Sequence, residues 1–297
     1  MSCVVVTWRR TASKPSARLP ALQLSDRWMR DTHRAGDMTA VDFAAFVDEL
    51  ADASGEKILP FFRTALGVED KGGAGRFDPV TEADRAAEAT IRALIKKTFP
   101  DHGIVGEELG SDNPDAEYVW VVDPIDGTRA FIIGYPIWGT LIGLTRFGES
   151  VFGMMHQPFT RERFTGDRQG AKYRGPAGER SLHVRTCANV SDAVMLTTSP
   201  QMFDDAERER FHRLEKKVRL PRFGGDCYAY CMLAAGHADL VVEAGLKPFD
   251  IVALIPIITG AGGIVTTWDG KPAESGGRII AACDRRVHQQ AMEILNA

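Results

Sequence analysis

Cysteine is scarce in this sequence and is not arranged for cross-linking. Five cysteines are spread over 297 residues, and no two of them form a C-x-x-C pair. An odd and scattered set of this kind gives no sign of a disulfide framework and favours a reducing compartment, so we expect a cytoplasmic protein. The five are Cys3, Cys187, Cys227, Cys231 and Cys283.

Long apolar runs and an excess of one charge are also missing. No stretch approaches the roughly 20 apolar residues of a transmembrane helix, so we expect no membrane partner. Lys and Arg number 36 against 40 Asp and Glu, which gives a formal net charge of −4 and no electrostatic footprint for nucleic acid. A mildly acidic protein can still bind a phosphate ester if metal ions supply positive charge locally.

Several common catalytic motifs are absent as well. The sequence has no H-E-x-x-H, no G-x-S-x-G and no Walker loop, and its histidines are scattered. Each histidine is therefore more simply explained as structural than as catalytic. What remains is a set of carboxylates in separated segments, and hard oxygen ligands of this type suit Mg²⁺.

The first 37 residues differ from the rest of the chain. They hold six arginines with scattered Ser and Pro and show no sustained hydrophobic periodicity. A transit peptide is one interpretation, because such segments are rich in Arg and Ser. Asp26, Asp31 and Asp37 weigh against it, and a helix start follows Met38. We therefore favour a mis-annotated or disordered extension over residues 1–37.

The most informative stretch lies near the middle of the chain. Five apolar or aromatic residues, 118–122, lead into Asp123-Pro-Ile-Asp126-Gly-Thr128. An apolar run that ends in Pro and Gly predicts a buried strand stopping at Asp123, and ligands bind outside the carboxyl ends of strands in open α/β sheets. Two carboxylates this close repel unless a cation lies between them or one is protonated. The alternative is a turn with solvated acids.

That six-residue string resembles the central signature of the inositol monophosphatase superfamily, a group of magnesium-dependent, lithium-sensitive phosphomonoesterases. Three further segments match the family. Residues 78–84, which end in Asp84, are similar to its D-x-V-T-x-x-D element, and Gly106-Glu107-Glu108 is similar to its G-E-E element. Residues 249–252 resemble its W-D-x-A element, although Phe249 replaces Trp. Alone, Asp84 would mark a helix start and Asp250 a helix cap.

The resemblance implies a magnesium site with two or three ions. One Mg²⁺ would bind Glu107, Asp123 and the carbonyl of Ile125, and a second would bind Asp123, Asp126 and Asp250. The two ions would clamp the attacking and leaving oxygens of an in-line displacement at phosphorus. Because no residue of the motif set is missing, we expect an active magnesium-dependent phosphoric monoester hydrolase.

The resemblance also assigns roles around the phosphate. Thr128, hydrogen-bonded to Asp84, would position and deprotonate the attacking water. The N–H groups of Gly127 and Thr128 would hold the phosphate oxygens. Lys71 is a further candidate, since the family has a lysine in a mobile loop at this place.

Hydrophobic periodicity predicts alternating helices and strands along the whole chain. We place a domain boundary near residue 185, so that an α/β subdomain over 38–184 holds most metal ligands and one over 185–297 completes the metal and substrate site. The resemblance implies a layered αβαβα sugar-phosphatase fold with the metals at the junction, and a homodimer. Expected helices cover 39–62, 81–99, 205–216, 226–235 and 251–258, and expected strands cover 104–106, 118–123, 138–144, 151–155 and 238–243, with a further hairpin over 157–174.

Several matches favour the histidinol-phosphate phosphatase branch of the family. They include Arg129-Ala-Phe131 after the signature and Gly225-Asp226-Cys-Tyr-Ala-Tyr230. Histidinol phosphate has an ammonium and an imidazole, so spare carboxylates would suit it, and Asp226 and Glu243 are the candidates. Otherwise Asp226 caps a helix and Glu243 ends a strand. The predicted reaction is hydrolysis of L-histidinol phosphate to L-histidinol and phosphate, as in histidine biosynthesis.

Two other functions stay open at this point. Inositol-1-phosphate, or a broad range of sugar phosphates, is the alternative substrate. A function of a different class, known for some family members, is binding to the transcription machinery with residual phosphatase activity. The balanced charge argues against it, and Asp123→Asn separates the classes because only a binding role would survive that change.

Overall fold

The computed structural model describes residues 40–64, 68–70 and 79–297. The chain divides into two compact units, Met1–Phe43 and Ala44–Ala297, and the second carries almost all described elements. The predictions for residues 1–37 and for Lys71 lie outside the described residues. Within these residues, no helix has the length and apolar character needed to cross a bilayer.

Most predicted helices are confirmed, with shifted ends. The predicted helix over 251–258 is wrong as a single element, because the chain forms two short helices there, α6 and α7. The helices are α1 (Ala40–Ile58), α2 (Glu82–Thr98), α3 (Thr128–Ile132), α4 (Asp205–Glu215), α5 (Asp226–Ala234), α6 (Pro248–Ile251), α7 (Leu254–Gly260) and α8 (Arg285–Leu295), with short 3-10 turns η1 (Leu59–Phe61), η2 (Val190–Asp192) and η3 (Pro200–Met202).

The strands form one two-stranded, one eight-stranded and one five-stranded sheet among the described residues. They are β1 (Val68–Asp70), β2 (Pro79–Thr81), β3 (Gly103–Gly106), β4 (Gly110–Asp112), β5 (Tyr118–Asp126), β6 (Gly139–Arg146), β7 (Glu149–Gln157), β8 (Glu162–Asp167), β9 (Gly170–Gly175), β10 (Gly178–Ser181), β11 (Val194–Thr197), β12 (Leu220–Phe223), β13 (Leu240–Leu246), β14 (Ile264–Thr267) and β15 (Gly277–Ala282).

The eight-stranded sheet has the order β10-β9-β8-β7-β6-β5-β3-β4 and is antiparallel except where β3 pairs with β5. Gly148 lies in the turn that joins β6 to β7 and has a positive φ of 82°, which glycine adopts readily. The central strand β5 does not stop at Asp123 as predicted. It runs on to Asp126 through an irregularity in its pairing with β6, because a bulge lets pairing continue past the extra residues.

The five-stranded sheet has the order β12-β11-β13-β15-β14. Its strand β11 pairs in parallel with both β12 and β13, whereas β15 is antiparallel to its neighbours. The strand predicted to end at Glu243 continues to Leu246, with a shift in register after Glu243. The carboxyl ends of β11, β12 and β13 therefore lie along the same edge of this sheet.

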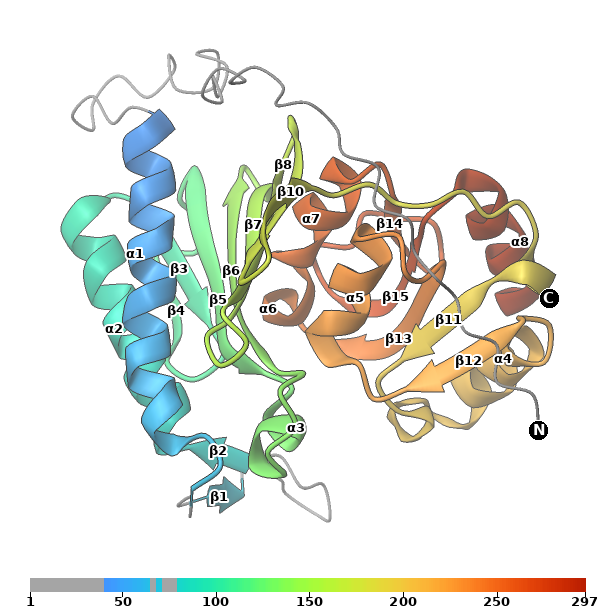
Figure 1. Cartoon of the computed structure of the whole chain (residues 1–297), viewed down its shortest axis with the longest axis horizontal. Coiled ribbons are helices and arrows are strands. Elements are labelled where there is room, and N and C mark those ends of the chain that lie inside the picture. The colour runs from blue at the N-terminus through green and yellow to red at the C-terminus, as the bar shows by residue number, and fades with distance from the viewer. Residues whose placement is uncertain (1–39, 65–67, 71–78) are drawn as a thin grey trace, which may run out of the picture. The chain divides into compact units, whose positions relative to one another are not determined.

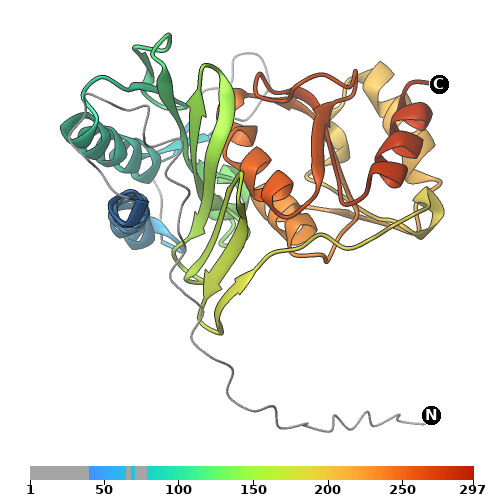
Figure 2. The same ribbon diagram turned by 90° about the horizontal axis from the view of Figure 1, so that it is seen from above.

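Helices and the two large sheets alternate in the second unit, as the fold prediction required. The helix α2 packs on one face of the eight-stranded sheet, and α5, α6 and α7 lie between the two sheets (Figures 1 and 2). The helices α4 and α8 cover the far face of the five-stranded sheet. The core between the sheets joins residues of both sheets and of the helices between them, including Leu141 of β6, Val241 of β13 and Leu254 of α7.

A row of glycines lets α6 and α7 approach the eight-stranded sheet. Gly143, Gly153 and Gly166 are aligned across β6, β7 and β8. A Cβ on Gly143 would lie 2.7 Å from Val252, and one on Gly153 or Gly166 would overlap the backbone at Ala253 or at Pro256. The helix backbones therefore rest directly on the strands, which fixes the height of Asp250 above the sheet.

Adding a side chain at one of these aligned glycines is expected to destabilise the protein. Gly153→Ala pushes a methyl group into the backbone of Ala253, and overpacking of this kind costs about 1–3 kcal/mol. We expect urea unfolding to show that loss. The control Glu149→Ala, an exposed position of the same strand, should stay within about 0.5 kcal/mol of the parent. Equal stability of the two variants would contradict a close packing of α6 and α7 on the sheet.

Candidate active site

Three carboxylates from two elements meet at the end of β5. One oxygen each of Asp123, Asp126 and Asp250 lies within 4.8 Å of the others. Residues three apart in a regular strand point to opposite faces, so Asp123 and Asp126 would normally diverge. The irregularity of β5 between them brings both to the same side. The helix α6 supplies Asp250 from above the glycine row.

Backbone amides hold each of these carboxylates in place. The N–H of Ile125 donates to Oδ1 of Asp123 at 3.0 Å, and the N–H of Cys227 donates to Oδ2 of Asp126 at 2.8 Å. The N–H of Lys247 donates to Oδ2 of Asp250 at 2.6 Å. One oxygen of each group is thus fixed by the chain itself, which orients the whole carboxylate.

The cluster carries strong like-charge repulsion. Burial raises the pKa of Asp123 well above its usual value, and the charges of Glu107, Asp126, Asp84 and Asp250 raise it further. Burial also raises the pKa of Asp126, followed by the charges of Asp250 and Asp226, while the hydrogen bond from Cys227 opposes the shift. A cation among these groups would relieve both effects.

The donor set fits Mg²⁺. The ligands of one octahedral Mg²⁺ lie at about 2.1 Å from it and so within about 4.2 Å of one another. The three aspartates offer oxygens at a comparable separation. All are carboxylates, with Asp123 buried at 2% exposure, and among the residues that the structure describes neither His nor Cys joins the group. The arrangement is therefore chemically suited to a hard divalent cation.

A second acidic group lies next to the first. It contains Asp84 of α2 with Glu107 and Glu108, which follow β3. Glu108 was not predicted. Its side chain pairs with Arg85 at 3.6 Å, and its N–H donates to Oε2 of the fully buried Glu88 at 2.7 Å. Glu88 is four residues after Asp84 on one helical face, which is the signal that could have identified this support.

Thr128 does not make the predicted hydrogen bond to Asp84. Its hydroxyl donates to the carbonyl of Ile125 at 3.1 Å. The reason is local: Gly127 takes a left-handed φ of 82°, which turns the chain so that Thr128 lies over the carbonyl three residues earlier. Thr128 therefore bonds to the carbonyl predicted as a metal ligand.

The two predicted specificity residues differ in their surroundings. Asp226 is half-buried, and a Cβ on Gly127 would lie 3.1 Å from its Cβ. Burial and the charge of Glu243 raise the pKa of Asp226 to about 6, against the opposing effect of Arg129. Asp226 thus lies directly beside the Asp-Gly-Thr turn.

Glu243 is instead committed to hydrogen bonds inside the protein. It is 4% exposed, and its two oxygens accept from the N–H of Thr198 at 2.8 Å and from the hydroxyl of Tyr230 at 2.9 Å. The hydroxyl of Thr198 in turn accepts from the N–H of Asp226 at 3.1 Å. Glu243 therefore fixes the segment that holds Asp226.

Removing one charge from the cluster should have opposite effects with and without metal. Asp123→Asn keeps Oδ1 for the N–H of Ile125 and removes the repulsion, so we expect a higher melting temperature in EDTA. In Mg²⁺ at a hundred times its dissociation constant the parent should gain about 2.7 kcal/mol, and the variant should not. Thermal unfolding measured once in EDTA and once in Mg²⁺ checks both expectations, with Glu149→Gln as control. An unchanged response of Asp123→Asn to Mg²⁺ would contradict a metal site here.

Comparison with known proteins agrees with this geometry. The model of the inositol monophosphatase family matches residues 39–297. The chain is 43% identical over 265 residues to the bifunctional phosphatase IMPL2, chloroplastic, of Arabidopsis thaliana, covering 85% of this chain and 75% of that one. It is 35% identical over 226 residues to a histidinol-phosphatase of Chlorobaculum parvum, covering 75% of this chain and 85% of the other.

A solved structure shares the fold. An inositol monophosphatase from Zymomonas mobilis superimposes with a TM-score of 0.78 at 40% sequence identity, and the match covers 88% of this chain and all of that one. The two large sheets and their helices thus follow the arrangement of an inositol monophosphatase fold.

Proposed function

This chain belongs to the inositol monophosphatase family and is a phosphatase, and we propose that its substrate is L-histidinol phosphate, which it hydrolyses to L-histidinol and phosphate with Mg²⁺. The observation that carries the choice of substrate is the carboxylate of Asp226 beside Gly127. Histidinol phosphate presents an ammonium group, whereas inositol phosphate presents uncharged hydroxyls. A half-buried carboxylate next to the phosphate-binding turn favours the cationic substrate. The 35% identity to a histidinol-phosphatase supports the same choice.

The metal ligands proposed are Glu107, Asp123, Asp126 and Asp250 with the carbonyl of Ile125. Two or three Mg²⁺ ions, when bound there, supply a Lewis acid at the phosphoryl oxygens and lower the pKa of a bound water. The chain's own part is to hold the carboxylates of Asp123, Asp126 and Asp250 in place through backbone amides, which limits reorganisation during the reaction.

Asp84 and Thr128 are proposed to orient the attacking water. Thr128 lies at the turn after β5, with its hydroxyl on the Ile125 carbonyl, and Asp84 shares a group of carboxylates with Glu107. The N–H groups of Gly127 and Thr128 are proposed to bind the phosphate oxygens. Glu243 is proposed to act on the substrate through Thr198 rather than by direct contact, because both its oxygens accept internal hydrogen bonds. The functional unit is proposed to be a homodimer.

Inositol-1-phosphate is the second candidate substrate. The observation in its favour is the likeness to the inositol monophosphatase from Zymomonas mobilis, at 40% identity over its whole length. Phosphate release from the two esters at matched concentrations, with Mg²⁺ present, separates the candidates. We expect kcat/KM to favour histidinol phosphate by about a hundredfold or more, which corresponds to roughly 2.7 kcal/mol.

A charge-removing variant tests the role of Asp226. Asp226→Asn should lower kcat/KM for histidinol phosphate about 10- to 100-fold, equivalent to about 1.4–2.7 kcal/mol. It should change the value for inositol-1-phosphate by less than about threefold. Asp205→Asn is the matched control, because Asp205 opens α4 as Asp226 opens α5 and is fully exposed. Equal losses on both substrates would assign Asp226 a purely structural role.

A further inference from the structure

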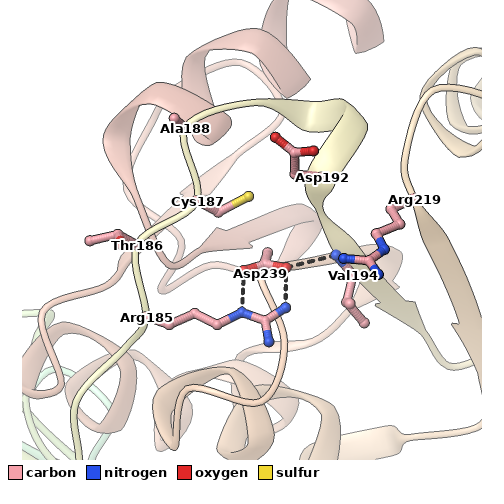
Figure 3. A pocket seen from close by; sticks show the side chains of 8 residues that line it. All are labelled: Arg185, Thr186, Cys187, Ala188, Asp192, Val194, Arg219 and Asp239. Atoms are coloured by element: carbon pink, nitrogen blue, oxygen red, sulfur yellow. Dashed lines mark hydrogen bonds and ion pairs between the residues drawn. The ribbon is translucent and has the colours of Figure 1, made fainter.

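A cavity of about 290 Å³ lies at the edge of the five-stranded sheet (Figure 3). It would hold about ten waters at roughly 30 Å³ each, and so a molecule of about ten non-hydrogen atoms. Residues from the chain between β10 and β11 line one side, and residues just before β12 and β13 line the other. They include Arg185, Cys187, Asp192, Val194, Arg219 and Asp239.

The ion pair of Arg185 and Asp239 at the cavity stabilises the fold. Asp239 is 1% exposed and accepts hydrogen bonds from both Nε and Nη2 of Arg185, the first at 2.6 Å. It also accepts from the N–H of Val194 at 2.7 Å. Arg185 and Asp239 therefore neutralise each other and tie the start of β11 to the start of β13.

A second pair of opposite charges is left for a ligand. Within the described part of the chain, the structure gives the Arg219 guanidinium neither an ion pair nor a side-chain hydrogen bond, and Figure 3 shows it extending toward Val194. Asp192 lies across the cavity, and its Oδ2 accepts from Asn189 at 3.0 Å. The charged side chains of the lining sum to zero, which disfavours a multiply charged anion and suits a molecule that carries both signs.

The cavity and the proposed substrate site lie at opposite ends of the same three strands. The strand β11 begins at Val194, β12 begins one residue after Arg219, and β13 begins one residue after Asp239. At the other ends of these strands, Thr198 follows β11. Its N–H donates to Glu243 of β13, and its hydroxyl accepts from the N–H of Asp226. β12 ends at Phe223, three residues before Asp226. A four-residue strand spans only about 13 Å.

We propose that this cavity is a second ligand site for a small zwitterion of the α-amino acid class. The ligand carboxylate binds Arg219 and its ammonium binds Asp192. Occupancy shifts the amino end of β12 relative to β11 and β13, and β12 carries that shift to Asp226. The ligand thereby changes the binding of the phosphate ester at the carboxyl ends.

Calorimetric titration of the full-length protein tests the binding. The probes are L-leucine, L-glutamine and L-histidine, each beside the amine formed by removing its carboxylate. We expect at least one amino acid to bind and its amine to bind at least tenfold more weakly. Arg219→Gln should weaken the binding at least tenfold, whereas Arg222→Gln, which changes an exposed arginine of β12 that does not line the cavity, should not.

Two controls separate this site from the carboxylate clusters. Asp123→Asn should bind the probe as the parent does, because it changes only the metal site. A saturating probe should change KM for the phosphate ester several-fold in the parent and leave it unchanged in Arg219→Gln. The proposal is overturned if none of the three amino acids binds, if an amine binds equally well, if Asp123→Asn loses binding, or if Arg219→Gln binds and responds like the parent.

Discussion

The repulsion among the clustered carboxylates at the end of β5 is the constraint on which this structure depends. Asp123, Asp126 and Asp250 hold oxygens within 4.8 Å of one another, and each added charge makes the ionised form of its neighbours less favourable. The fold tolerates this arrangement because a backbone N–H is bonded to every member. The same repulsion makes the cluster receptive to a divalent cation, since the attraction of a bound cation offsets it.

Bringing these groups together requires the two halves of the chain to meet closely. The aligned glycines of β6, β7 and β8 remove the side chains that would hold α6 and α7 away from the sheet. Asp250 can then reach the end of β5, and α5 can direct the N–H of Cys227 at Asp126. Packing of small residues thus sets the electrostatics of the site, which is why one methyl group in this row matters more than an exposed charge.

The direction of the strands decides which residues lie together in the five-stranded sheet. Parallel pairing of β11 with β12 and β13 places their carboxyl ends beside the signature turn and their amino ends around the charged cavity. Glu243 shows the consequence for function, because it holds Thr198 and Tyr230 instead of facing outward. The selectivity proposed for Asp226 therefore depends on residues that need not touch the substrate.

The sequence by itself determined the family, the alternation of helices and strands, and the acidic residues of the cluster, because the Asp-Pro-Ile-Asp-Gly-Thr string and its flanking periodicity are local patterns. Only the tertiary structure decided where β5 ends, which partner Thr128 takes, and that Glu108 and Glu88 support the site. Bulges and contacts between distant segments depend on neighbours that are remote in the chain, and the Thr128 hydrogen bond depends on the backbone conformation that Gly127 takes in the folded protein. A pattern read along one segment cannot contain them.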